Sequence, residues 1–198
     1  AAEEHIAWDI GALALAEELS RRLDAPLLAA GYSRLLIDLN RPLEAPDSIP
    51  PHSEVYPVPG NRELSETVRR YRQDCLFHPF HQRLTQLLDE RQAAGVPTRV
   101  VGVHSFTPVY HGRPRPLVAG VLYRNAGAYA RRILDGLRRH GLEVAGNQPY
   151  AIDPAEDTTV PVHGDARGLE AVLLEIRNDG LRTPDAVYAW AERLYPWL

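Results

Sequence analysis

The chain has 198 residues, of which 44% are hydrophobic and 24% charged, and its formal net charge is −4. This length and composition predict one globular domain, and the small negative charge gives no indication of nucleic-acid binding. The single cysteine, Cys75, excludes an internal disulfide. All 22 basic residues are arginine, which excludes Schiff-base and P-loop lysine chemistry. No apolar run approaches about 18 residues, so no membrane span is predicted.

The first third of the chain predicts a helix, two short strands and a long loop. Apolar residues recur at helical spacing over residues 6–24. Residues 27–30 and 33–38 read as short strands, and the second leads into Asn40 and Arg41. Residues 42–62 hold six prolines, so we expect an ordered loop there, and loops of this length are often functional.

The middle of the chain predicts a long helix followed by a buried strand. Ser65 is a suitable N-cap for a helix that continues to Gly95. Pro79 lies inside this pattern and is expected to kink or split the helix. The apolar run 99–103 predicts a strand with His104 and Ser105 at its C-terminal end.

The last part alternates strands and helices. We expect a strand over 117–123, a helix over 126–140, a strand over 171–177 and a final helix that begins at Thr183. Strands that alternate with helices indicate an α/β fold with a mostly parallel or mixed sheet. No internal repeat or second domain is visible, so residues 1–198 are interpreted as a single domain.

Polar side chains follow three of the predicted strands. They are Asn40 with Arg41, His104 with Ser105, and Glu175 with Arg177. The C-terminal ends of strands in an open α/β sheet are the usual place for a ligand, so these groups are expected to share one cleft. An imidazole, a carboxylate and guanidinium groups are what a zinc hydrolase needs to activate water and orient an anionic substrate.

Each of these residues also has a purely structural interpretation. His104 could be a satisfied structural histidine and not a metal ligand. Glu175, inside an apolar strand, could form a salt bridge with an arginine and not act as a base. Arg41 could anchor the proline-rich loop and not bind a substrate carboxylate. His78 and His81, on either side of Pro79, are interpreted as wall residues of the site and not as ligands.

Six motifs in order along the chain resemble the N-formylglutamate amidohydrolase family, which is related to zinc-dependent carboxypeptidases and aspartoacylase. The resemblance covers nearly the whole chain. The motifs are Asp38-Leu39-Asn40-Arg41, Pro59-Gly60-Asn61, His78-Pro79-Phe80-His81, Val103-His104-Ser105-Phe106-Thr107-Pro108, Gly146-Asn147-Gln148-Pro149-Tyr150, and His163-Gly164 with Leu174 to Asp179.

This resemblance implies a three-layer α/β/α fold with a mixed, mostly parallel central sheet. It implies hydrolysis of a linear amide that releases formate and an amino acid such as glutamate, a step of amino-acid catabolism. His104 and Asp9 would be zinc ligands, and Glu175 the general base. Arg113 or Arg177 would stabilise the oxyanion. The residues expected to bind substrate are Asn40, Arg41, Ser105, His163 and Asn147.

The sequence departs from the pattern of the wider group at its beginning. That pattern places a further histidine ligand on a strand before residue 6, and we interpret the chain as lacking this strand. The alternative to a zinc enzyme is therefore a catalytically impaired pocket protein that binds an acidic amino acid or peptide. In both cases the expected partner is a small molecule, with no nucleic acid or membrane involved, and the expected location is the cytoplasm. The sequence does not indicate an oligomeric state.

Overall fold

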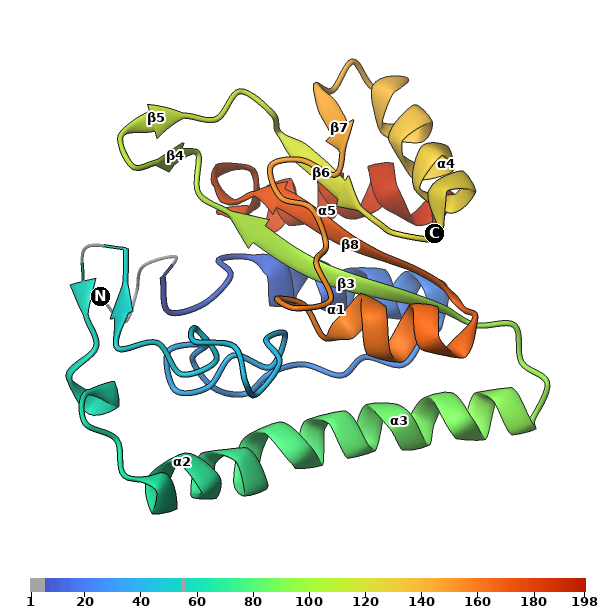
Figure 1. Cartoon of the computed structure of the whole chain (residues 1–198). Coiled ribbons are helices and arrows are strands. Elements are labelled where there is room, and N and C mark those ends of the chain that lie inside the picture. The colour runs from blue at the N-terminus through green and yellow to red at the C-terminus, as the bar shows by residue number, and fades with distance from the viewer. Residues whose placement is uncertain (1–5, 55) are drawn as a thin grey trace.

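A computed structural model describes residues 6–54 and 56–198. Its central sheet has four strands in the order β3–β8–β6–β7 (Figure 1). Strands β3 and β8 pair in parallel, as do β6 and β7, whereas β8 and β6 are antiparallel. The sheet is therefore mixed and mostly parallel, as expected. The strands span Arg99–Phe106 (β3), Glu170–Arg177 (β8), Ala119–Leu122 (β6) and Val144–Gly146 (β7).

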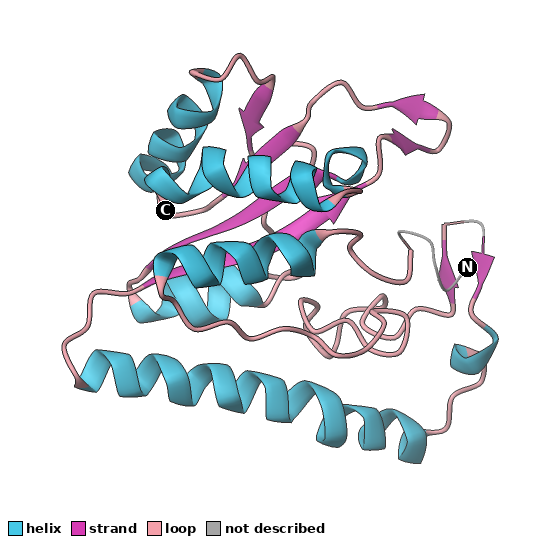
Figure 2. Cartoon of the chain, turned by 180° about the vertical axis from the view of Figure 1, so that it is seen from behind, coloured by secondary structure: helices cyan, strands magenta, loops and turns pink. Residues whose placement is uncertain are grey.

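Helices cover both faces of this sheet, which confirms the three-layer α/β/α fold. Helices α1, α4 and α5 pack on one face and share the main hydrophobic core with the sheet (Figure 2). On the other face, α3 and the helical turn Thr159–Gly164 pack against a smaller apolar cluster. The helices of the first layer span Ala12–Leu23 (α1), Gly127–Arg138 (α4) and Pro184–Leu194 (α5).

Alternation along β8 decides which side chains face which layer. Val172, Leu174 and Ile176 belong to the main core, whereas Ala171 and Leu173 belong to the smaller cluster on the other face. Successive side chains of a strand point to opposite faces. Glu175 therefore shares the face of Leu173, as the sequence pattern predicts.

The long helix is continuous but changes its winding before Pro79. Helix α2 (Glu66–Arg72) begins at Ser65, whose Oγ accepts a hydrogen bond from the Val68 N–H. The wider π-helical turn Gln73–Phe77 leads into α3 (His78–Ala93). Proline has no N–H to donate, and the wide turn accommodates it. The helix thus stays one rod (Figure 1), with a change of winding directly before Pro79 in place of the expected kink or split.

The first helix begins later than predicted. Gly11 precedes α1 with a φ of 78°, and a Cβ at this position would lie 2.4 Å from the Cβ of Leu181. A residue with a side chain is strained at positive φ. The chain therefore turns over residues 6–11 before the helix starts, although Ile6 and Ala7 are buried as the apolar pattern requires.

The two strands predicted over 27–30 and 33–38 do not form, and this prediction was wrong. Backbone groups of this segment form hydrogen bonds with nearby residues in turns. The Leu36 N–H donates to the Ser33 carbonyl at 2.9 Å, and the Asn40 N–H donates to Asp38 Oδ1 at 2.9 Å. Ile37 packs with Ile49 and Phe77, away from the sheet. Local turns that satisfy the backbone compete with strand pairing.

Two short hairpins project from the domain. Strand β1 (His52–Ser53) pairs with β2 (Tyr56–Pro57), and β4 (Val109–Tyr110) pairs with β5 (Arg113–Pro114). The predicted ordered loop over 42–62 thus contains one of these hairpins. None of the described helices is both long and apolar enough to cross a lipid bilayer.

Candidate active site

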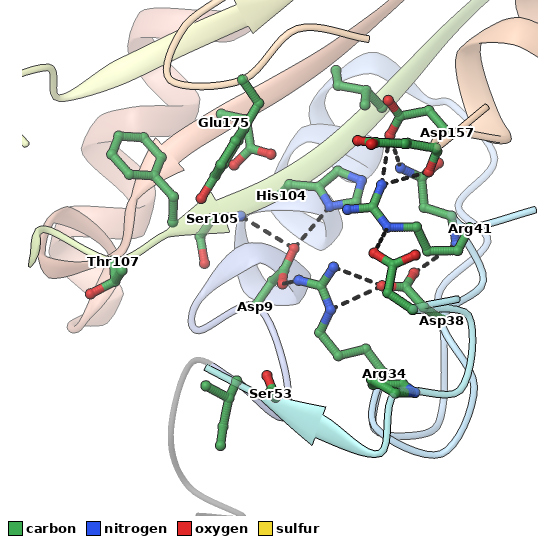
Figure 3. Close-up of a pocket in the computed structure, with 18 of the residues that line it drawn as sticks. Asp9, Arg34, Asp38, Arg41, Ser53, His104, Ser105, Thr107, Asp157 and Glu175 are labelled. Atoms are coloured by element: carbon green, nitrogen blue, oxygen red, sulfur yellow. Dashed lines mark hydrogen bonds and ion pairs between the residues drawn. The ribbon is translucent and has the colours of Figure 1, made fainter. Parts of the chain in front are cut away.

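His104 and Glu175 are direct neighbours across the two central parallel strands. The register pairs His104 of β3 with Glu175 of β8 and Ser105 with Ile176. Adjacent strands are about 4.8 Å apart and paired residues share a face, so the imidazole and the carboxylate project from the same side of the sheet. This confirms that these two strand ends share one site (Figure 3).

A cavity of about 500 Å³ lies over this pair. The parts of the chain that enclose it are the segment 6–9, the irregular segment 34–54, the sheet end with Tyr110 of β4, and the segment 150–157. Its titratable lining is Asp9, Arg34, Asp38, Arg41, Asp47, His52, Glu54, His104, Tyr110, Tyr150, Glu156, Asp157 and Glu175. A concave site of this size with convergent polar groups suits a small-molecule ligand.

Asp9 holds the imidazole of His104. Its Oδ2 lies 2.9 Å from His104 Nδ1 and also accepts a hydrogen bond from the Ser105 N–H at 3.4 Å. Burial alone would lower the pKa of His104, but the hydrogen bond and the negative charge of Asp9 outweigh it and raise that pKa to about 9. Asp9 therefore fixes the orientation of the ring. Ser105 lines the cavity, but its hydroxyl donates to the Ile10 carbonyl at 2.9 Å.

Glu175 is a buried carboxylate with an unused oxygen. Its side chain lines the cavity, the residue is 7% exposed, and Oε2 has no hydrogen-bond partner. Among the described residues no arginine forms an ion pair with it, so the salt-bridge interpretation is wrong. Burial raises the pKa of Glu175 to about 7, and a carboxylate with such a pKa can both accept and return a proton near neutral pH.

Arg34 is a site residue that sequence reasoning missed. Its guanidinium donates to Asp38 Oδ2 at 2.7 Å through NH2 and to Asp9 Oδ1 at 3.3 Å through NH1. It thus connects the His104–Asp9 pair to the segment that carries Asn40 (Figure 3). Nothing in the spacing of Arg34 reveals this bridge, because its two partners come from different parts of the chain.

Asn40 and Arg41 line the cavity, but their polar groups form hydrogen bonds and ion pairs with other residues of the chain. Asn40 Nδ2 donates to Asp157 Oδ1 at 2.9 Å, and its Oδ1 accepts the Thr159 N–H at 3.0 Å. Arg41 forms ion pairs with Asp47 at 2.8 Å and with Asp157 at 3.3 Å. These contacts support the loop-anchoring interpretation of Arg41, because its charge is already neutralised within the chain.

Three other predicted site residues lie outside the set that lines the cavity. Arg177 donates to Asp179 and to the carbonyls of Arg115 and Pro116, so its guanidinium is fully engaged elsewhere. Arg113 is exposed on strand β5. Asn147 Oδ1 accepts the Tyr123 N–H at 2.9 Å and stabilises a turn. The placement of these three residues therefore does not support their expected substrate and oxyanion roles.

His163 also lies outside the cavity, where it pairs with His81. The two rings stack with centroids 5.0 Å apart, and His81 Nδ1 lies 2.8 Å from His163 Nε2. His81 Nε2 donates to the Leu39 carbonyl at 2.9 Å. A neutral histidine has one donor and one acceptor nitrogen, so His81 Nδ1 must accept and His163 Nε2 must donate. The pair supports the loop that carries Asn40, but neither His81 nor His78 belongs to the set that lines the cavity, so the interpretation of these histidines as wall residues of the site is not confirmed.

This pair predicts a loss of stability in mild acid. Burial lowers the pKa of His163 to about 4, from an ordinary value of 6.5, so the folded state favours the neutral ring. The stabilisation is complete above pH 6.5 and is lost as the pH falls toward 4, by up to about 1.4 kcal/mol per pH unit. The raised pKa of Glu175 has the opposite effect over this range, so urea unfolding between pH 4 and 7 measures the His163 effect as a difference in slope between wild type and variants. H163Q, which keeps an N–H donor, should flatten this slope, and exposed His140→Gln should not; equal slopes in all three proteins would contradict the assignment.

The family model described as N-formylglutamate amidohydrolase matches residues 1–181. The chain belongs to the N-formylglutamate amidohydrolase family. Members of this family cleave amides, and the site has the buried carboxylate that such a reaction requires.

Two solved structures resemble this family member over almost its whole length. The gene product Atu2144 from Agrobacterium tumefaciens is 42% identical, with a TM-score of 0.94 over 98% of this chain and 77% of that protein. N-formylglutamate amidohydrolase from Ralstonia eutropha JMP134 is 21% identical, with a TM-score of 0.68 over 94% of this chain and 78% of that protein, which shows a shared fold. No curated protein matches the chain.

The zinc site expected of this amidohydrolase family is only partly supplied by the described residues. His104 Nδ1 and Asp9 Oδ2 are 2.9 Å apart, close enough for both to contact one ion. A zinc site uses at least three protein ligands, and within residues 6–54 and 56–198 no three His, Cys, Asp or Glu side chains are placed to hold a metal. A third ligand would have to join these two.

Proposed function

We propose that the chain hydrolyses the amide bond of an N-formyl or other N-acyl amino acid, with N-formylglutamate as the first substrate to test. The observation that carries this proposal is the buried carboxylate of Glu175, a residue that lines the cavity beside His104 and whose Oε2 has no hydrogen-bond partner. Family membership supports amide hydrolysis, and the volume of about 500 Å³ accommodates an N-acyl amino acid.

In this reaction Glu175 takes a proton from water, and the resulting hydroxide attacks the formyl carbon. The C–O bond that forms turns the carbonyl oxygen into an oxyanion. Glu175 then returns the proton to the amide nitrogen, the C–N bond breaks, and formate and the free amino acid leave. While no ion is bound, Asp9 holds the His104 ring beside Glu175 through its contact with Nδ1.

We include a zinc ion in this proposal, with His104 and Asp9 as two of its ligands. Bound zinc supplies Lewis-acid activation of water and of the carbonyl. Elemental analysis of the purified protein should find zinc, and His104→Ala should reduce the zinc content. Zinc content that is equal in both proteins would contradict the ligand assignment independently of any activity. We also propose a cytoplasmic location for this chemistry.

The second candidate function is binding of an acidic amino acid or peptide without hydrolysis. The incomplete ligand set around His104 favours it. The two functions are separated by incubating the protein with N-formylglutamate and measuring formate. Time-dependent formate release supports hydrolysis, whereas saturable binding in calorimetry with no formate supports the binding protein.

A further inference from the structure

An anionic substrate needs a cation, and the two arginines that line the cavity are already paired. Arg34 is neutralised by Asp38 and Asp9, and Arg41 by Asp47 and Asp157. Both guanidinium charges are thus already balanced by carboxylates of the chain. The site therefore calls for another positive group.

Arg115 has the properties of that group. Its guanidinium lies over the rings of Tyr110 at 4.5 Å, Tyr150 at 5.0 Å and Phe106 at 5.6 Å, and all three of these residues line the cavity. No carboxylate in the described part of the chain forms an ion pair with it. Stacking on aromatic faces holds a guanidinium in place without neutralising its charge.

The backbone of Arg115 is also fixed on both sides. Its N–H donates to the Pro108 carbonyl at 2.8 Å, and its carbonyl accepts from Arg177 NH1 at 2.9 Å. In the side chain, NH1 donates to the Tyr150 hydroxyl at 2.7 Å. Among the residues that the structure describes, this bond engages one of its five N–H donors, which leaves donors for a carboxylate.

The positive charge of Arg115 acts at the catalytic end of the cavity. It is one of the charges that lower the pKa of Glu175 against the larger effect of burial. Arg115 stacks on Tyr110 and Tyr150, which line the same cavity as Glu175.

We propose that Arg115, held by Phe106, Tyr110 and Tyr150, binds a carboxylate of the substrate and makes the site selective for anionic N-acyl amino acids. This inference rests on the proposed function and names its substrate class. It also gives Arg177 a role consistent with its contacts, as a residue that positions Arg115 through the backbone carbonyl.

The test compares R115Q with R113Q on three substrates. These are N-formylglutamate, N-formylglutamine, which lacks the side-chain carboxylate, and N-formylisoglutamine, which lacks the α-carboxylate. R115Q should raise KM for N-formylglutamate about 10- to 100-fold, as expected for a lost charged hydrogen bond, with a smaller change in kcat. Neither arginine belongs to the set that lines the cavity, but Arg115 contacts three aromatic residues of that set. Arg113 is exposed on strand β5, so R113Q should leave KM unchanged.

The substrate comparison separates binding from a positioning role. If Arg115 binds a carboxylate, one of the two carboxamide substrates must become insensitive to R115Q, and the insensitive one identifies the carboxylate bound. Equal losses on all three substrates, or a larger effect of R113Q, would overturn the proposal. R115K keeps the charge and should restore part of the affinity, which also provides a folded variant if R115Q is unstable.

Failure of the proposed function would be recognised separately. If no substrate releases formate with the wild-type chain, calorimetry with N-formylglutamate still measures binding to wild type, R115Q and R113Q. Weaker binding to R115Q alone supports the carboxylate contact in a non-hydrolytic protein. Binding that R115Q does not weaken, or no binding to any of them, overturns it.

Discussion

Replacing Glu175 by glutamine is expected to reduce kcat for formate release at least about 100-fold, while the protein folds normally. Glutamine has the size and shape of glutamate but cannot accept the proton of the attacking water. Glu175 is buried, and its Oε2 has no partner that glutamine would lose. A neutral amide also costs less to bury than a charge, so the free energy of unfolding should be unchanged or higher.

A matched control lies on the same strand. Glu170 is at the other end of β8, where it is exposed and paired with Arg99 at 2.7 Å. Glu170→Gln loses only a surface ion pair, worth about 1 kcal/mol or less, and should retain full activity. Single-turnover kinetics and thermal unfolding of both variants measure the two effects. Turnover of E175Q at the wild-type rate would eliminate Glu175 as the base.

The sequence could predict that His104 and Glu175 lie together, because both residues stand on neighbouring strands of one sheet. Apolar runs before His104 and around Glu175 identified two strands, and parallel neighbours present their C-terminal ends together. The structure pairs these two residues directly. Short strands over 27–30 and 33–38 were predicted from composition alone, and there the turns at Ser33 and Asp38 satisfy the backbone instead.

The sequence could not predict which arginines lie at the site. The sequence offers Arg113 and Arg177 as oxyanion residues, and nothing in it distinguishes Arg115 from them. The choice depends on hairpin β4–β5, which leaves Arg113 exposed and places Arg115 among aromatic rings, and on Asp179, which engages Arg177. Arg34 was missed for the same reason, because its partners Asp9 and Asp38 meet only in the folded chain.

Substituting Gly120 by alanine is expected to reduce kcat/KM at least about tenfold and to lower the free energy of unfolding by about 1–3 kcal/mol. Gly120 of β6 pairs with Glu175, and a Cβ there would lie 1.8 Å from the Gln148 carbonyl oxygen. The obstacle is backbone, so segment 147–151 would have to move. That segment carries Tyr150, which lines the cavity and contacts Arg115.

Gly60 provides the comparison, because a Cβ at Gly60 meets no atom within 4 Å. Gly60→Ala should therefore change neither activity nor stability beyond about 0.5 kcal/mol. Chemical denaturation and kcat/KM for N-formylglutamate measure both variants. The sequence alone does not reveal that the backbone of another segment packs against a glycine, because glycine has no side chain that would give a hydrophobic or polar pattern. If G120A were as active and as stable as G60A, the close packing of segment 147–151 on Gly120 would not be required for activity or stability. It would then not explain why Tyr150 lies beside Arg115.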